Sequence, residues 1–571
     1  MGQHQIKKIT IKFKVKLGKF NPAISGTAEE NMSGRIIRKT EVACFKNFVR
    51  AKDPVKSSWQ VGFLFPVLFL SLLIGFCGCQ GQKPSPKVEP PPPEVFPTVT
   101  PEELLSRGEA ELHKFTIPGC KAAAGYFEQA RQLKPEFAPA YGRLAVTYAL
   151  WAKERNDLGL DNLEQWVNGY YYSLKAKEFG LEADYLKASA LLSNSRNFIR
   201  RQEYRIFFSE IKNRFRKESA ELTLSYLRDI FTTGEFKKET LNLPLENLGH
   251  VLDGNPEEAE ALAFKSMVQL LTPDDPSLVK VMEIRPDWPL PYFLLGLFQK
   301  SRGEFQKAEN WFNLTLQKNP EHPRALSELG ELLFLGKKYE EAEQVLQKAL
   351  ALDQEMPRPH LLLGLILREK AEYEKALEHF RMITATIPDH EEALYYQSLV
   401  LVEMANWPQA LESLNALVAI AGSYEIYGYS LKALCYLMLE QLSEAEADGR
   451  RALEISSSYY LPYYILGLVN FRREDWLKAS QNFQQALKID RTFDDGHYFL
   501  GQTYFKLRDL RKARAELSLA AQIFEQEIKQ AEQLVDQAQA QGWARKVERL
   551  STQKKELEVK VKNCRQLLSS L

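Results

Sequence analysis

The sequence predicts an all-α protein built from stacked helix pairs, an α-solenoid, because two residue classes recur with one period. Small residues recur at spacings of 34 or 35 at Gly296, Gly330, Gly364, Ser398, Ala433, Gly467 and Gly501. An alanine follows each of them by twelve residues, and a Phe or Leu follows by sixteen in six of the seven units. Periods of this length are typical of helical repeats, whose units stack because none can bury its apolar face alone.

Each residue class has a physical role in such a unit. A small residue lets the first helix (helix A) approach the second (helix B) closely, and the bulky residue sixteen positions later fills the groove beside it. Gly449 stands where the fifth unit should carry the bulky residue, so we expect that unit to be packed less tightly.

The pattern over residues 286–520 resembles the tetratricopeptide repeat (TPR), a helix-turn-helix unit of 34 residues. The resemblance implies seven repeats in a right-handed superhelix, with helix A residues lining a concave groove that binds an apolar segment or helix of a protein partner. The groove residues it implies are Phe293, Leu297, Leu361, Leu365, Tyr395, Tyr396, Leu399, Tyr464, Leu468, Tyr498, Phe499 and Phe505. The alternative is that many of these side chains pack between adjacent helices.

Helical segments also flank the regular array. Residues 101–285 keep pieces of the pattern without its period, which predicts irregular or degenerate helical repeats. Residues 521–571 contain two runs with apolar residues every three or four positions, separated at Gly542. They predict a helical hairpin that caps the array, or alternatively a coiled coil that joins two copies.

The first hundred residues divide into three parts of different composition. Residues 1–58 carry thirteen Lys and Arg against four acidic residues, which predicts a basic and disordered leader; Met1 and Met32 are both candidate starts. Residues 59–79 are uncharged and mostly apolar, as in a signal peptide or membrane anchor. Residues 80–100 are rich in proline and predict an extended tether.

The end of the apolar stretch, Phe76-Cys77-Gly78-Cys79, resembles the lipobox of bacterial lipoproteins. The resemblance implies that Cys79 is lipidated and that the chain is held on the outer membrane, facing the periplasm. The alternative is an uncleaved helix that anchors the chain in the inner membrane. Either anchor places the body of the chain outside the cytoplasm, because the basic residues precede the apolar stretch.

The sequence contains few signals for nucleic-acid binding, metal binding or catalysis. The net charge of +1 includes +9 from residues 1–58, so the rest is mildly acidic and no nucleic-acid partner is expected. Six cysteines and eight histidines show no metal-ligand spacing, so we expect no metal and no cofactor. No catalytic motif is present.

These observations favour a non-enzymatic scaffold of the bacterial cell envelope that binds proteins, in the assembly of a pilus, secretion or cell-wall complex. Two alternatives remain open: an enzyme, either a hydrolase or a transferase, with its site in residues 149–285, and a membrane-anchored subunit with an uncleaved transmembrane helix. A segment of residues 196–217 rich in basic and aromatic residues is a further candidate for contact with lipid or an acidic partner, although a solvated basic helix face explains it as well.

Overall fold

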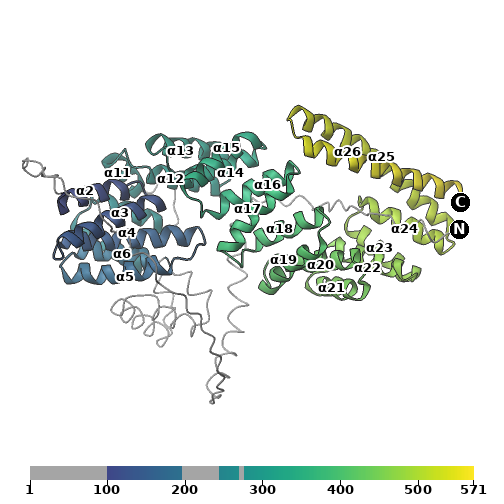
Figure 1. The fold of residues 1–571 in the computed structure, drawn as a ribbon, viewed down its shortest axis with the longest axis horizontal. Coiled ribbons are helices and arrows are strands. Elements are labelled where there is room, and N and C mark those ends of the chain that lie inside the picture. The colour runs from purple at the N-terminus through teal and green to yellow at the C-terminus, as the bar shows by residue number, and fades with distance from the viewer. Residues whose placement is uncertain (1–98, 194, 196–242, 269–275) are drawn as a thin grey trace, which may run out of the picture. The chain divides into compact units, whose positions relative to one another are not determined.

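The computed structural model describes residues 99–193, 195, 243–268 and 276–571, and all the regular elements among them are α-helices (Figure 1). The predicted all-α fold of stacked TPR-type helix pairs is confirmed. The predicted leader, the apolar stretch with Cys79, nearly all of the tether and the basic segment 196–217 lie outside the described residues. Within the described part, none of the helices has the length and hydropathy that crossing a membrane requires.

Each of the seven units found in the sequence corresponds to one helix pair. The helices A are α12 (Leu290–Ser301), α14 (Pro323–Leu335), α16 (Pro357–Glu369), α18 (Glu391–Glu403), α20 (Glu425–Met438), α22 (Tyr460–Arg472) and α24 (Asp494–Lys506). The helices B are α13 (Phe305–Lys318), α15 (Tyr339–Leu352), α17 (Tyr373–Thr386), α19 (Trp407–Ile420), α21 (Leu442–Ile455), α23 (Trp476–Ile489) and α25 (Leu510–Ala540).

The small residue and the bulky residue of a unit meet as the sequence pattern requires. A Cβ atom placed on Gly364 would lie 2.5 Å from the ring of Phe380, which is fully buried in the same unit. The same close approach joins Gly296 to Phe312. In the fifth unit, Leu466 from the next helix A lies beside Gly449.

A residue with positive φ ends each helix A. It stands seven positions after the small residue in every unit: Gly303, Lys337, Ala371, Ala405, Glu440, Glu474 and Arg508. A left-handed residue just past a helix end lets the last carbonyl groups accept hydrogen bonds. Glu372 accordingly donates its backbone N–H to the Leu367 carbonyl at 2.8 Å, and helix B begins at the next residue.

The helices before the array differ in length but share one apolar core. They are α2 (Pro101–Leu112), α3 (Ile117–Leu133), α4 (Ala138–Asp157), α5 (Leu163–Glu178), α6 (Glu182–Ser193), α9 (Leu243–Gly254), α10 (Ala259–Val268) and α11 (Pro276–Ile284). Their core includes the buried Phe127, Trp166 and Phe264 and continues to Leu290 of α12. Gly108 meets the ring of Phe127 as the array glycines meet their Phe, so α2 and α3 form a similar pair.

The last helix B, α25, continues far beyond its unit, and α26 (Ala544–Ser569) runs back along it as a hairpin (Figure 1). The turn holds Gly542 at φ +70°, which suits a residue without a side chain. At the base of the hairpin, Phe524, Leu557 and Cys564 form an apolar cluster against which Tyr498 of α24 packs.

We expect the Gly364→Ala substitution to lower the free energy of unfolding by about 1 kcal/mol. Overpacking a filled core costs about 1–3 kcal/mol, which exceeds the roughly 1 kcal/mol that alanine gains over glycine in a helix. Gly125→Ala is the matched control, because this exposed helical glycine has open space where the Cβ would stand. It should raise the stability. Urea unfolding of both variants measures the two effects, and a stabilised Gly364→Ala variant would contradict the packing argument.

Candidate partner-binding surface

The structure divides the twelve predicted groove residues into two equal sets. Six are buried between helices: Phe293, Leu361, Tyr395, Leu399, Tyr464 and Leu468. Six are partly exposed: Leu297, Leu365, Tyr396, Tyr498, Phe499 and Phe505. Helix A contacts its own helix B, the helix B of the preceding unit and the neighbouring helices A, so only part of its inner side is left for a partner.

Six tyrosines from three successive units of the array contact one another through their rings. We call this group the tyrosine cluster; its members are Tyr395, Tyr396, Tyr424, Tyr427, Tyr459 and Tyr460, from the start of α20 and α22 and from the first half of α18. Ring centroids lie 5.0 Å apart between Tyr395 and Tyr424 and 5.2 Å apart between Tyr427 and Tyr459. Tyr396, Tyr424, Tyr427 and Tyr459 are partly exposed.

Burial favours the neutral form of several phenol groups in the tyrosine cluster. Burial raises the pKa of Tyr395, Tyr424 and Tyr459 above the ordinary value of a phenol, so the hydroxyl groups stay protonated. Such a surface offers apolar ring faces together with hydroxyl groups, a combination that is enriched where proteins bind one another.

Sequence reasoning found the buried Tyr395 and the partly exposed Tyr396, but it missed the partly exposed Tyr424, Tyr427 and Tyr459. These three lie nine, six and eight residues before the small residue of their units, so they do not follow the period. One signal for Tyr459 was present in the sequence, because Tyr459 and Tyr460 are adjacent, as Tyr395 and Tyr396 are.

Ion pairs connect the helices A of the first four units. Lys300 of α12 contacts Glu331 of α14 at 2.9 Å, and Arg358 of α16 binds the same carboxylate through two nitrogen atoms, at 2.8 and 2.9 Å. Burial alone would raise the pKa of Glu331, but the two cations lower it to about 2. This carboxylate is therefore ionised, and cations of the protein itself neutralise its charge. It connects three units and is not a candidate ligand-binding group.

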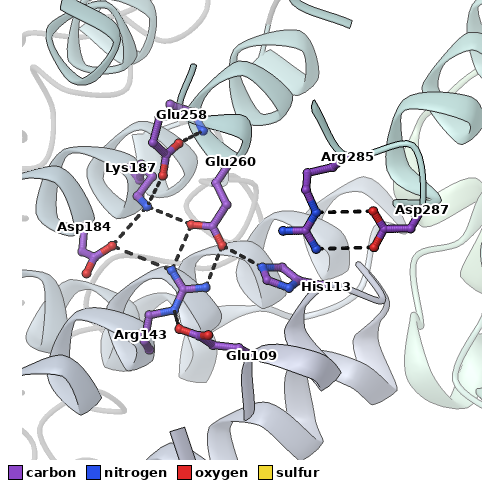
Figure 2. A network of polar contacts seen from close by, with 10 residues as sticks. Glu109, His113, Arg143, Asp184, Lys187, Glu258, Glu260, Arg285 and Asp287 are labelled. Carbon is purple, nitrogen blue, oxygen red and sulfur yellow. Dashed lines mark hydrogen bonds and ion pairs between the residues drawn. The ribbon is translucent and has the colours of Figure 1, made fainter. Parts of the chain in front are cut away.

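A denser network joins four helices in the irregular part (Figure 2). Glu260 of α10 accepts hydrogen bonds from Arg143 of α4 at 2.6 and 2.9 Å and from Lys187 of α6 at 2.8 Å. His113, at the end of α2, lies 3.4 Å from the same carboxylate. The side chains of Glu260, Arg143 and Lys187 are 9%, 11% and 5% exposed, so the network is nearly closed to water.

The charges of this network are fixed. Burial opposes the charged forms, yet the opposite charges prevail: the pKa of Glu260 is lowered, and the pKa values of Arg143 and Lys187 are raised. A general acid or base needs a pKa moved toward neutrality, and these three groups move away from it. The network therefore connects helices, and it gives no support to the alternative of an enzyme with its site in residues 149–285.

Two histidines at equivalent places in the third and seventh units have equivalent partners. His360 and His497 each place Nε2 against the carbonyl group six residues earlier, at 3.1 and 3.0 Å. Nδ1 faces the residue nineteen positions later, which is His379 in one unit and Glu516 in the other. This agrees with a packing role for both. Among the described residues, no group of three His, Cys, Asp or Glu is arranged to hold a metal ion.

Cys120, Cys435 and Cys564 are buried free thiols. Burial raises the pKa of Cys435 to about 12 and that of Cys564 to about 11, and it raises the pKa of Cys120 as well. These thiols are consequently protonated side chains of the core.

Comparison with known proteins assigns the repeat type. Residues 300–366 match the family model of the Tetratricopeptide repeat, and this is the repeat that the seven helix pairs form. TPR folds generally serve as scaffolds for protein interaction. No curated protein sequence matches the chain.

Solved structures that resemble the chain share its repeats. YrrB, described as a TPR protein with an unusual peptide-binding site, is 18% identical with a TM-score of 0.30, over 32% of this chain and 95% of its own. Pseudomonas aeruginosa pilF is 18% identical with a TM-score of 0.32, over 36% and 94% of the two chains. The APC/C complex Cut9–Hcn1 is 13% identical with a TM-score of 0.39, over 71% and 76%. Likeness at this level concerns the helical repeat alone.

We expect Glu260→Gln to destabilise the protein by about 3 kcal/mol, because removing one partner of a buried ion pair leaves the other charges uncompensated. Glu103→Gln is the control: its pair with Arg107 is half exposed on both sides and should contribute less than about 1 kcal/mol. Urea unfolding gives the difference, and amide hydrogen exchange should locate the loss in α4, α6 and α10. Equal effects of the two substitutions would show that the network is not a structural tie.

Proposed function

We propose that this protein is a scaffold of the bacterial cell envelope, which binds an apolar segment or helix of a partner protein on the inner side of its helices A. The observation that carries the proposal is the tyrosine cluster, an aromatic surface that spans three successive units. Clustered aromatic side chains supply much of the binding energy of protein interfaces. The partly exposed Tyr498, Phe499 and Phe505 continue the apolar character in the last unit.

The proposed location rests on the N-terminal sequence. Basic residues, an uncharged apolar stretch and the lipobox-like Phe76-Cys77-Gly78-Cys79 follow one another in the order of a lipoprotein signal. Lipidation of Cys79 would hold the chain on the outer membrane, and the proline-rich residues after it would carry the repeats away from the lipid surface. An uncleaved inner-membrane anchor is the competing arrangement. Assembly of a pilus, secretion or cell-wall complex is the role we propose for the scaffold.

Photo-crosslinking tests the binding surface. With p-benzoylphenylalanine at position 459, irradiation of cells should give a crosslinked product with a partner protein that mass spectrometry identifies. The same group at Met382, which is 52% exposed on helix B α17, is the control and should not capture that partner. Tyr427→Ala should weaken the crosslink at position 459, because it removes a ring that contacts Tyr459. Capture of the same partner at equal yield from Met382 would exclude the tyrosine cluster as the binding surface.

Intact mass and membrane fractionation test the anchor. We expect a mature chain that begins at Cys79 with attached acyl groups and sediments with the outer membrane. Cys79→Ser should prevent acylation and cleavage, because the thiol that accepts the lipid is absent, whereas Cys77→Ser should be processed normally. A full-length chain of unmodified mass in the inner membrane would support the uncleaved anchor instead.

A further inference from the structure

The two ends of the C-terminal hairpin contact different parts of the array. Its base packs against α24, where Lys560 of α26 pairs with Asp495 and the Phe524 cluster excludes water. Its turn, residues 541–549, contacts the second, third and fourth units, more than 130 residues away in sequence. The hairpin and the units between α16 and α24 therefore form a closed ring of contacts, which we call the circuit.

The surface under the turn is acidic and aromatic. We call it the acidic edge; it consists of Tyr339 and Glu340 of α15, Glu369 of α16, Tyr373 and Glu374 of α17, and Glu403 of α18. Both tyrosines are the first residue of a helix B, a position that is apolar in every unit of the array: Phe305, Tyr339, Tyr373, Trp407, Leu442, Trp476 and Leu510.

Opposite charges and one tryptophan hold the turn on the acidic edge. Trp543 lies 5.7 Å from Tyr339 between ring centroids and donates its indole N–H to Glu340 at 2.9 Å. Arg545 pairs with Glu374 at 2.7 Å.

Two more cations of the turn complete the contact. Lys546 lies 3.5 Å from Glu369, and Arg549 lies 3.8 Å from Glu403. The guanidinium group of Arg549 also lies over the ring of Tyr373, at 5.4 Å.

The strength of the contact differs between the two ends of the hairpin. At the base, seven buried side chains form the apolar cluster. At the turn, the apolar contact with the array is a single pair of rings, Trp543 and Tyr339, beside Ala538 and Leu550 of the hairpin, and the Arg545–Glu374 pair is 57% and 64% exposed. Exposed ion pairs contribute little and weaken with salt, whereas an apolar cluster does not. The turn is consequently the end that separates first.

We propose that the hairpin is a salt-sensitive latch: its turn docks reversibly on the acidic edge, while its base stays fixed on α24. Docking closes the circuit and covers Tyr339 and Tyr373; release opens the circuit and exposes the acidic edge. While the turn is docked, the hairpin and the units from α16 to α24 form a closed ring. A folded partner that has no free chain end can enter this ring only after the turn has left the acidic edge. The latch therefore controls access to the units between α16 and α24, whatever protein binds there.

Zero-length carbodiimide crosslinking of the full chain tests the latch, because it joins a lysine to a carboxylate only when the two are in contact. Docking predicts an intramolecular crosslink from Lys546 to Glu369 at about 0.1 M salt, and at least a five-fold lower yield at about 1 M salt, where the Debye length falls from about 10 Å to about 3 Å. Lys554 and Glu532, 2.7 Å apart within the hairpin, give an internal control that should persist because packed helices hold them together.

A matched pair of charge reversals separates docking from general charge effects. Arg545→Glu should lower the Lys546–Glu369 yield at least five-fold, and Arg545→Glu with Glu374→Arg should restore it. Arg565→Glu is the control, because it changes the net charge by the same amount as Arg545→Glu. It breaks a pair with Glu525 at the base of the hairpin, so it should leave the yield of the Lys546–Glu369 crosslink unchanged. The Lys554–Glu532 crosslink reports in each variant that the hairpin is still formed.

Three results would overturn the latch. One is a Lys546–Glu369 yield that responds neither to salt nor to Arg545→Glu, which means fixed docking. Another is the absence of this crosslink while the Lys554–Glu532 crosslink forms, which means that the turn does not dock. The third is a Lys546–Glu369 crosslink found only between two chains.

Discussion

The close contact between the two helices of each unit is the constraint on which the array depends. At Gly364 the backbone of helix A lies so near Phe380 that no side chain fits between them. This contact fixes how the pair crosses, and the left-handed residue that follows, Ala371 in this unit, directs the chain from helix A into helix B. Successive pairs then bury the apolar faces that single pairs leave open. The surface available to a partner is what remains of helix A after this packing.

Charged side chains play two different parts around this apolar framework. Glu331 and Glu260 are buried, and each is surrounded by cations from other helices, which offsets the cost of removing the charge from water. The Glu260 network lies in the part of the chain where the repeat period is absent, and its contacts connect α2, α4, α6 and α10. At the hairpin turn, by contrast, the Arg545–Glu374 pair is exposed on both sides, so water can solvate both charges when the pair separates.

The sequence was sufficient for the fold of the array but not for its surface. The seven helix pairs were predictable because a small residue of helix A and, in six of the seven units, a Phe or Leu of helix B recur at fixed positions where the two helices meet. Tyr427 and Tyr459 were not, because residues that face outward have no packing requirement to repeat. The burial of Tyr464 and Leu468 depends on the neighbouring units, which the pattern of one unit does not describe. Arg143 and Glu260 are 117 residues apart, and no local pattern connects them.

The buried thiols affect whether the folded chain is stable in an oxidising compartment. Disulfide formation requires a thiolate that another sulfur atom can reach, and Cys120, Cys435 and Cys564 are both protonated and enclosed by neighbouring side chains. An oxidising compartment such as the periplasm would therefore leave them unmodified. The same burial means that these thiols become reactive only when the surrounding helices unfold. Disulfides formed between thiols exposed in this way would prevent the chain from returning to the native fold.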